Sequence, residues 1–432
     1  MTYCVPVGTE LQTLTGEQRR ALFDRGRAND AKIAATVAQL IADVRTRGDA
    51  ALREQAEQFD GVSNLQIEVP QEDWQTAVQR MNAKVREALE QAAHNIAKFH
   101  EAQLPTNLEM EVQPGVTLGR RPDALARVAV YAPGGRAAYP SSVLMGVVPA
   151  RVAGVKEVIV CSPAGLDGKP PETVLAACAI GHADRLFAIG GAGAIAAVAF
   201  GTETIPRADK VVGPGNAYVT EAKQQVNGVI AIDSPAGPSE VLVLADETAN
   251  AELVAFELLA QAEHDPDAAA VVLSTSSELL RAVADVIERA IAAQPRNAII
   301  TTSLAARGAL LLAASQSEMI EFNNAYAPEH LAIYCQNPRA VLAQIRNAGT
   351  VFLGESASVA FGDYMTGANH VLPTAMLARS YSGLSTLDFI RWTTYQEISM
   401  DAAAALSAPT GILADAEGLP AHAQAARLRA RP

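Results

Sequence analysis

The sequence predicts an α/β fold with two Rossmann-like parallel-sheet domains, a helical N-terminal segment and a helical C-terminal arm. The chain has 432 residues, too many for one hydrophobic core, and this length indicates two to four domains. Short β-branched runs alternate with helical patterns through the middle of the chain, which is typical of right-handed crossovers and a parallel sheet. The same alternation then restarts, which indicates a second domain of similar design.

Helical periodicity dominates residues 1–109. One pattern opens at Gly16, an amphipathic stretch covers residues 30–59, and a further helical run covers residues 71–103. The second pattern ends at the turn signal Asp60-Gly61-Val62, and the third ends at Leu104-Pro105-Thr106. We expect this segment to pack on the core of the protein.

Residues 110–236 have the pattern of the first sheet domain. We expect strands at 127–131, 157–161, 185–189 and 210–212, and helices at 141–153, 173–180 and 192–200. In the second sheet domain, residues 237–375, we expect strands at 240–244, 269–273 and 298–301, and helices at 249–264 and 278–293. The last segment, residues 376–432, is Ala-rich and predicted to be largely helical, and such an arm is a frequent dimerisation device.

Composition argues against several classes of function. The formal net charge of −13 disfavours nucleic acid or an anionic membrane surface as the main partner. No run of about 18 residues is apolar throughout, so no membrane span is expected. The first residues lack the pattern of a signal peptide. The four cysteines are widely spaced, without a Cys-x-x-Cys pair, and predict reduced thiols in a cytoplasmic protein.

Three glycine-containing motifs follow predicted strands. Residues 191–196, Gly-Ala-Gly-Ala-Ile-Ala, formally match a dinucleotide-binding fingerprint, with Asp209 near the distance expected for a ribose-binding acid. This match alone is a weak signal, because such turns are common in α/β proteins. Gly-Pro-Gly-Asn at 213–216 is more unusual and predicts a rigid loop, although a plain tight turn is the alternative. With Tyr-Ala-Pro-Gly-Gly at 131–135, the loops predict a ligand crevice across the first sheet.

Four of the seven histidines lie beside carboxylates or a carboxamide in the C-terminal half. Neutral imidazole is a common transition-metal ligand and a proton-transfer group near neutral pH. Gln261 and His264 are three residues apart at the end of a predicted helix, so both side chains leave one face. With Asp363 and another histidine they would form a ligand set suited to zinc. The alternative for His264 is a helix C-terminal cap beside Asp265-Pro266.

Two further pairs suggest proton transfer. Glu329 and His330 are adjacent and follow Pro328, so they could serve two different proton transfers; a solvated glutamate beside a packed histidine is the alternative. Glu417 and His422 are five residues apart, about 140° around an ideal helix. They reach one site only if the helix bends, starts there or presents its end, and the proline between them favours such an irregularity.

Taken together, these phrases closely resemble the histidinol dehydrogenase family, whose members catalyse the last step of histidine biosynthesis. The other matching phrases are Ala-Gly-Pro-Ser-Glu at 236–240, Gly-Asp-Tyr at 362–364 and Gly-Ala-Asn-His-Val-Leu-Pro-Thr at 367–374. The phrases occur in order over nearly the whole chain. Their joint occurrence is highly specific, although no single phrase is.

The resemblance implies oxidation of L-histidinol to L-histidine through L-histidinaldehyde, with two NAD reduced, by a zinc-dependent homodimer with intertwined subunits. It implies zinc ligands at Gln261, His264, Asp363 and His422, the last reaching across from the partner subunit. It implies substrate contacts at Ser239, Gln261, His264, His330, Asp363, His370, Glu417 and His422, with Glu417 also supplied across the dimer. It implies that His330 is the base for alcohol oxidation, that Glu329 activates water for aldehyde oxidation, and that Tyr131 and Asn216 contact NAD.

One position departs from the family pattern. The family usually has Gly-Gly-Ala-Gln where this chain has Gly-Gly-Ala-Gly at 190–193, so the glutamine that contacts NAD in the family is replaced by Gly193. The resemblance implies that the fingerprint at 191–196 is accidental, because family members do not hold NAD by that motif. This departure motivates the main alternative, a paralogous zinc- and NAD-dependent dehydrogenase acting on another small polar alcohol. A zinc hydrolase is disfavoured because the chain lacks His-Glu-x-x-His, and a non-catalytic binding protein because the catalytic set is complete.

Overall fold

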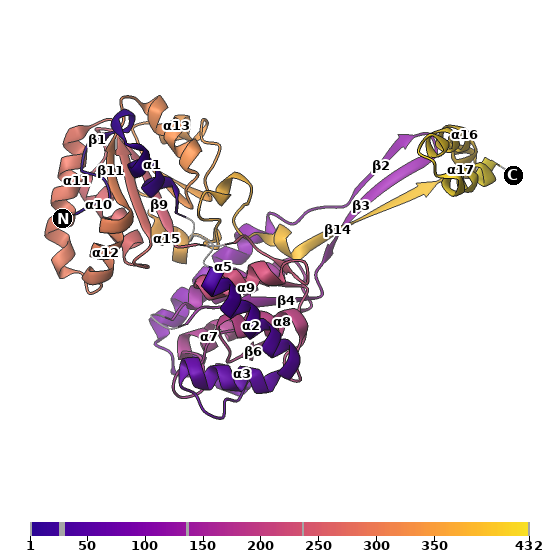
Figure 1. The fold of residues 1–432 in the computed structure, drawn as a ribbon, viewed down its shortest axis with the longest axis horizontal. Helices are drawn as coiled ribbons and strands as arrows, with labels where there is room; N and C mark the ends of the chain where they lie inside the picture. The colour runs from indigo at the N-terminus through magenta and orange to yellow at the C-terminus, as the bar shows by residue number, and fades with distance from the viewer. Residues whose placement is uncertain (1, 26–30, 135–137, 236, 431–432) are drawn as a thin grey trace.

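The computed structural model describes residues 2–25, 31–134, 138–235 and 237–430, and it consists of two parallel sheets with a long arm extending from them (Figure 1). The predicted α/β fold with two parallel sheets is confirmed. Asp30, Gly135 and Ala236, which belong to patterns noted above, lie outside the described residues. Among the described residues, no helix combines the length and the apolar character that a bilayer crossing requires.

The first sheet has five parallel strands in the order β6-β5-β4-β7-β8. Its strands are β4 (Arg127–Tyr131), β5 (Glu157–Cys161), β6 (Arg185–Phe187), β7 (Lys210–Val212) and β8 (Ala231–Ile232). The connecting helices are α6 (Pro140–Val152), α7 (Glu172–Ile180), α8 (Gly191–Phe200) and α9 (Ala217–Val226). Central strands such as β4 are buried on both faces, as expected for a parallel sheet between helices.

The N-terminal helices form an outer layer on this unit. Helices α4 (Gln71–Arg80) and α5 (Ala83–Glu101) pack on α7 and α6, and α2 (Ala31–Arg47) packs on α8 and α9. The predicted helix over residues 30–59 is divided at Gly48, whose φ of +55° starts the separate helix α3 (Asp49–Gln55). A Cβ atom at Gly48 would lie 2.2 Å from Oε2 of Glu203, so glycine permits this close approach. The run over 71–103 is also divided, because Asn82 caps a new helix.

The second sheet has six parallel strands in the order β1-β11-β10-β9-β12-β13. They are β1 (Thr9–Glu10), β9 (Glu240–Ala245), β10 (Ala269–Ser274), β11 (Gly308–Leu312), β12 (His330–Tyr334) and β13 (Thr350–Leu353). Alternate residues of β9 enter two different hydrophobic clusters, Val241 and Val243 on one face and Leu242 and Leu244 on the other. The first face packs on α10 (Ala251–Ala262), α11 (Ser277–Ala290) and α12 (Asn297–Arg307), and the second on α1 (Gly16–Phe23) and α13 (Gln316–Tyr326).

The strand predicted at 298–301 is wrong, since these residues belong to α12 and the strand β11 begins only at Gly308. The apolar run was too short to separate strand from helix, and the buried residues Ile300 and Leu304 have helical spacing. The N-terminal segment is shared between the two sheets, because β1 pairs with β11 while α2 packs on the first unit. The domain boundaries at 109, 236 and 375 stay a prediction.

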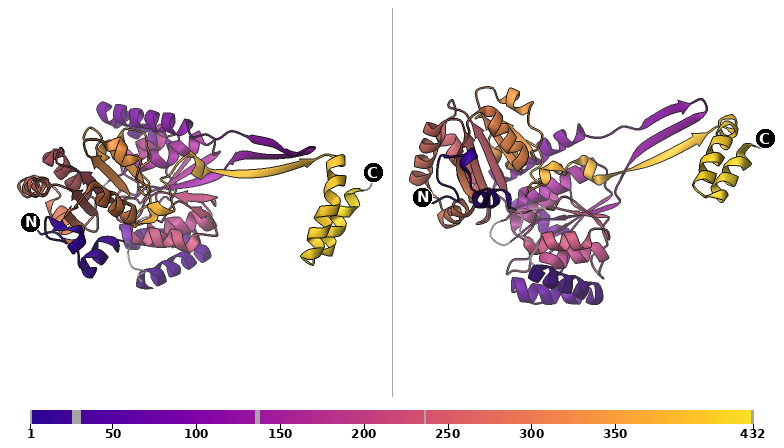
Figure 2. Two further views of the ribbon diagram at one scale, coloured as in Figure 1. Left: turned by 90° about the horizontal axis from the view of Figure 1, so that it is seen from above. Right: turned by 45° about the horizontal axis from the view of Figure 1, so that its top comes forward.

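The arm contains an antiparallel sheet of β2 (Leu108–Gln113), β3 (Val116–Ala124) and β14 (Ile390–Ile398), followed by α16 (Met400–Ala416) and α17 (Pro420–Arg427). Both views of Figure 2 show it standing clear of the two parallel sheets. The expectation of a largely helical segment from Met376 is therefore correct for α16 and α17 and wrong for residues 390–398. Strand β14 pairs with β3 over its whole length, a long-range contact that local composition does not reveal.

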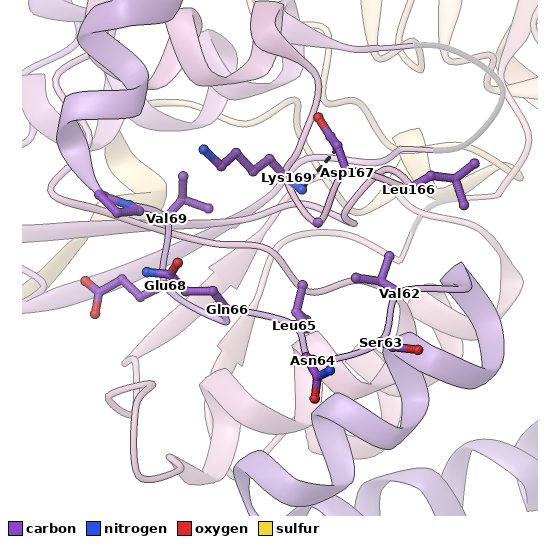
Figure 3. A pocket seen from close by; sticks show the side chains of 12 residues that line it. Val62, Ser63, Asn64, Leu65, Gln66, Glu68, Val69, Leu166, Asp167 and Lys169 are labelled. Carbon is purple, nitrogen blue, oxygen red and sulfur yellow. Dashed lines mark hydrogen bonds between the residues drawn. The ribbon is translucent and has the colours of Figure 1, made fainter.

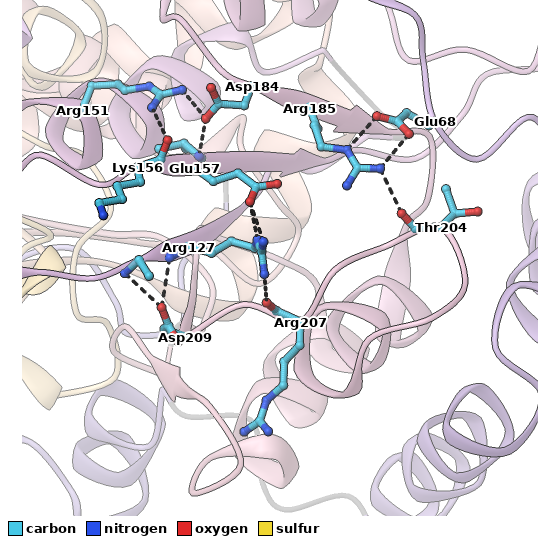
Figure 4. A network of polar contacts seen from close by, with 12 residues as sticks. Glu68, Arg127, Arg151, Lys156, Glu157, Asp184, Arg185, Thr204, Arg207 and Asp209 are labelled. Carbon is cyan, nitrogen blue, oxygen red and sulfur yellow. Dashed lines mark hydrogen bonds and ion pairs between the residues drawn. The ribbon is translucent and has the colours of Figure 1, made fainter.

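Ion pairs tie together the amino ends of the first sheet (Figure 4). Arg127 pairs with Glu157 at 2.6 Å, and Arg185 pairs with Glu68 at 2.7 Å. Asp209 accepts backbone hydrogen bonds from Ala126 and Arg127 at this same edge. Asp209 thus lies at the opposite edge of the sheet from the start of α8, which agrees with reading the dinucleotide fingerprint as accidental.

Candidate active site

A cavity of about 490 Å³ lies where the two parallel sheets meet. The first sheet contributes Pro133 and Gly134 after β4 and residues 214–216 after β7, at the carboxyl ends of its strands, where ligands of open α/β sheets bind. The second sheet contributes Ser239 just before β9 and the pair Glu329 and His330 at the start of β12. The cavity therefore joins the carboxyl ends of one sheet to the amino ends of the other.

Most of the site residues expected from the sequence lie at this cavity. The lining residues among them are Ser239, His264, Glu329, His330, Asp363, His370 and Asn216. Gln261 is buried one helical turn before His264, and its side-chain Nε2 has no hydrogen-bond partner among the described residues. Asp363 belongs to the short helix α15 (Val359–Tyr364), and His370 follows in the next loop.

His330 lines the cavity, and one of its two ring nitrogens is engaged in a hydrogen bond. Its Nδ1 lies 3.0 Å from the carbonyl oxygen of Glu240, so Nδ1 carries the proton and donates it. Its Nε2 is buried without a hydrogen bond among the described residues and lies 3.8 Å from Oδ1 of Asp363. Burial lowers the pKa of His330, and the Asp363 carboxylate partly opposes this effect. His330 is therefore a neutral imidazole with a free basic nitrogen.

Glu329 is a buried carboxyl group next to this imidazole. Its Oε2 accepts a hydrogen bond of 2.7 Å from the backbone N–H of Glu240 and lies 3.5 Å from Nδ1 of His330. Burial raises its pKa well above the usual range, and the negative charges of Glu240 and Asp363 add to this effect. A carboxylate with a raised pKa is a stronger base than an exposed one.

His370 and His264 complete the polar side of the cavity. Nδ1 of His370 donates to the carbonyl oxygen of Asp363 at 2.9 Å, and Oγ of Ser142 lies 3.5 Å from its Nε2. Burial lowers the pKa of His370; the Asp363 carboxylate partly opposes this effect, and repulsion from His264 adds to it. His264 itself is exposed and follows α10. His264 and Asp363 are therefore close enough to His370 to change its pKa electrostatically.

The loop at residues 213–216 brings its backbone close to the end of β4. Gly213 has a φ of +118°, and a Cβ atom there would lie 2.1 Å from the carbonyl oxygen of Tyr131. Asn216 caps α9, with its side-chain oxygen accepting from the N–H groups of Tyr218 and Val219. The buried hydroxyl of Tyr131 accepts a hydrogen bond of 3.1 Å from the N–H of Gly191.

Sequence reasoning missed two buried residues that hold this loop. Asp233 accepts from the N–H of Gly213 at 2.7 Å, and Lys223 donates to the carbonyl oxygen of Gly213 at 3.0 Å. Lys223 and Asp233 also form an ion pair with each other. The only local signal was a lysine on the inner face of a helix, which does not reveal its partner.

Gly193 does not line the cavity and faces helix α3 instead. A Cβ atom at Gly193 would lie 2.2 Å from Oε1 of Gln55 and 3.3 Å from Cδ2 of Leu52. The side chain of Gln55 therefore fills the space that a longer residue at 193 would need.

Glu417 and His422 lie apart from the other expected site residues. Glu417 is the C-cap residue after α16, His422 belongs to α17, and neither lines the cavity in this single chain. Among the described residues, no three His, Cys, Asp or Glu side chains are grouped so that they could hold a metal ion. The roles expected for Glu417 and His422 therefore stay predictions.

A second hollow, of about 230 Å³, lies on the first unit between residues 62–70 and 166–169 (Figure 3). Its charged groups are Glu68, Asp167 and Lys169, and Lys169 is already paired with Asp73 at 2.8 Å. None of the described residues that line it is a histidine. The hollow offers no acid–base pair, so the cavity between the sheets is the stronger candidate.

The fold and the cavity, with a neutral histidine beside a carboxyl group of raised pKa, define an α/β enzyme. The family model described as histidinol dehydrogenase matches residues 23–430. A histidinol dehydrogenase of Methanothermobacter thermautotrophicus is 47% identical over 410 residues, 95% of this chain and 96% of the relative. One of Methanosarcina mazei is 45% identical over 97% of each chain. The crystal structure of histidinol dehydrogenase from Elizabethkingia anophelis matches with a TM-score of 0.93 and 34% identity, covering 99% of this chain and 98% of that one.

The chain therefore belongs to the histidinol dehydrogenase family, as its motifs suggested. It is an oxidoreductase of histidine biosynthesis.

Proposed function

We propose that the protein oxidises L-histidinol to L-histidine through L-histidinaldehyde, with zinc bound and two NAD reduced. The observation that carries this proposal is the arrangement of His330 and Glu329. Two proton acceptors of different chemistry lie side by side in one cavity, and both are held by the backbone of Glu240. A four-electron oxidation at one carbon takes a proton from the alcohol in one step and from water in the other, and this pair offers one acceptor for each.

In the first step His330 removes the hydroxyl proton of the alcohol. Its Nε2 has no hydrogen-bond partner in the part of the chain that the structure describes, and the hydrogen bond from Nδ1 to the Glu240 carbonyl leaves Nε2 as the basic nitrogen. In the second step Glu329 removes a proton from the water that adds to the aldehyde carbon, so that the hydrate can lose hydride. Enclosure between the two sheets keeps the reactive aldehyde bound from one step to the next.

We propose Gln261, His264, Asp363 and His422 as the zinc ligands. The buried Gln261 supports this set: its amide Nε2 has no hydrogen-bond partner among the described residues, and a 180° turn of the amide would place the carbonyl oxygen, the ligating atom, at that unpaired position. His264 follows three residues later, just past the end of α10, and both His264 and Asp363 line the cavity. When bound, zinc supplies a template for the imidazole and amine of the substrate, and NAD supplies the hydride acceptor.

The remaining substrate contacts proposed are Ser239, His370 and Glu417. Ser239 and His370 line the cavity. Tyr131 and Asn216 are proposed to contact NAD, since Tyr131 is the last residue of β4 and Asn216 lies in the loop after β7, both at the carboxyl end of the first sheet. Gly193 supplies no side chain for such a contact, and the adjacent Gln55 occupies that space.

In this proposal the protein is a homodimer, and each arm supplies residues to the cavity of the other subunit. His422 and Glu417 would reach the cavity of the partner subunit. The arm supports this arrangement, because its helices expose large apolar side chains, among them Met400, Ile412 and Leu413, at 65–69% of their surface. We also propose the cytoplasm as the location, because all four cysteines are free thiols.

The test counts NADH formed by the purified zinc-loaded protein with limiting L-histidinol. Two equivalents per substrate are expected. One equivalent with accumulating aldehyde would contradict the role of Glu329. No turnover with zinc retained would favour the alternative, a paralogue that oxidises another small polar alcohol, and a panel of amino alcohols would then identify it.

A further inference from the structure

Glu240, the first residue of β9, touches both members of the acid–base pair through its backbone. Its N–H donates to Oε2 of Glu329 at 2.7 Å, and its carbonyl oxygen accepts from Nδ1 of His330 at 3.0 Å. The position of this single peptide segment therefore sets the direction of both proton acceptors. Neither hydrogen bond involves the Glu240 side chain.

The side chain of Glu240 is itself a buried carboxylate, with 1% of the residue exposed. Its Oε1 accepts a hydrogen bond of 2.7 Å from the N–H of Ala375, next to the cavity-lining Thr374. Its Oε2 forms an ion pair with the guanidinium of Arg25. A buried carboxylate without such a partner would be protonated or displaced toward water.

Arg25 comes from the N-terminal part of the chain, just after α1, and is 3% exposed. Besides Glu240, it donates to the carbonyl oxygen of Tyr326, and its guanidinium lies over the Tyr326 ring at 3.4 Å from the centroid. Tyr326 ends helix α13, which leads directly to Glu329 and β12. Arg25 thus joins the strand on which Glu240 lies to the segment on which the acid–base pair lies.

We propose that Arg25 is a positioning residue of this enzyme: by pairing with the Glu240 carboxylate and bridging to Tyr326, it holds the peptide that orients Glu329 and His330. Arg25 itself does not line the cavity. The inference rests on the proposed roles of Glu329 and His330. Small displacements of such groups cost on the order of 10- to 100-fold in rate.

The test compares Arg25→Met with the double variant Arg25→Met/Glu240→Gln. The single variant leaves a buried carboxylate unpaired, and we expect kcat for both oxidations to fall at least about 10-fold, with the KM for NAD unchanged. The double variant removes the unpaired charge and keeps an oxygen for the N–H of Ala375, so most of the lost kcat should return. Arg25→Lys keeps the positive charge but loses the planar guanidinium that can bind two partners at once, so its kcat should lie between those of the single and double variants.

Arg185→Met is the matched control. Arg185 also pairs with a glutamate, donates to a carbonyl oxygen (that of Thr204) and lies over an aromatic ring, but at the far edge of the first sheet. Its loss should lower stability and leave kcat unchanged. Arg25→Met with kcat within twofold of wild type, or a double variant no faster than the single one, would overturn the proposal.

Two other outcomes, an unfolded Arg25→Met variant and an inactive wild type, call for different comparisons. If Arg25→Met does not fold, Arg25→Lys and the double variant carry the comparison, and equal kcat values in both and in wild type would reject the role. If wild type does not oxidise histidinol, the proposed function fails by itself. A crystal structure of the single variant then decides the role of Arg25, since displacement of Glu329 from the Glu240 N–H is expected and unchanged contacts contradict it.

Discussion

At the scale of single residues, the two proton acceptors differ in what holds them and in which step they serve. His330→Asn should slow alcohol oxidation by roughly 10²- to 10⁴-fold while aldehyde oxidation is less affected, because only the first step uses its free Nε2. Glu329→Gln should show the opposite pattern. Single-turnover NADH formation, started separately from histidinol and histidinaldehyde, measures each step. Equal and negligible losses in both variants would reject the assignment.

The two acceptors also predict two different pH dependences. Each is active when deprotonated, so each rate rises with pH through the pKa of its group. Burial lowers the pKa of His330, which places the acidic limb of alcohol oxidation below the ordinary histidine value of 6.5. Burial raises the pKa of Glu329, which places the limb of aldehyde oxidation above the ordinary glutamate value of 4.5. Rate profiles of the isolated steps measure both limbs, and Glu329→Gln should abolish the second one.

Two glycines near the proposed NAD loops should respond differently to alanine. At Gly193 the added Cβ meets the flexible end of Gln55, so Gly193→Ala should change the free energy of unfolding by less than about 1 kcal/mol. At Gly213 the Cβ meets the carbonyl oxygen of Tyr131, and φ is +118°. Gly213→Ala should therefore cost at least about 2 kcal/mol and raise the KM for NAD. Urea unfolding and NAD titrations of both variants check this, and similar losses would contradict it.

At the scale of secondary structure, the sequence predicted best those strands that lie between helices. The β-branched runs at 157–161 and 210–212 agree with β5 and β7 to the residue, because turn residues bound them and both faces are buried. The strand predicted at 298–301 was wrong because an apolar run of four residues is too short to show a strand or helix period. The arm strand β14 was missed because its partner β3 is more than 260 residues away, at register pairs such as Ile390 with Ala124.

The residues that line the candidate site could be predicted from the sequence, but the buried ion pairs that hold them in place could not. Glu329, His330 and the loop at 213–216 could be found from sequence because unusual residue types occur together. Their supports, the Arg25–Glu240 and Lys223–Asp233 pairs, join residues that are distant in sequence or lack any local motif. Tertiary contacts of this kind decide orientation and pKa, and a single sequence does not encode them in any readable pattern.

At the scale of the whole molecule, the arm separates His422 from the cavity of its own chain, and this separation allows a decisive test. Since His422 is proposed to complete the partner's zinc site, the His422→Ala variant by itself should release zinc and lose activity. The Glu329→Gln variant by itself should lose aldehyde oxidation. A metal analysis that finds full zinc in His422→Ala would contradict the ligand.

Mixing the two inactive variants then distinguishes an arm that serves its partner from one that serves its own chain. In a heterodimer, one site combines an intact Glu329 with the intact His422 of the other chain. Random exchange of equal amounts makes about half of the dimers mixed, each with one active site of two, so aldehyde oxidation should recover to about a quarter of the wild-type rate. If His422 served its own chain, every site in the mixture would lack one of the two residues, and no activity would return. Size-exclusion chromatography of the mixture shows whether dimers formed, so an inactive mixture of true heterodimers would reject the shared site.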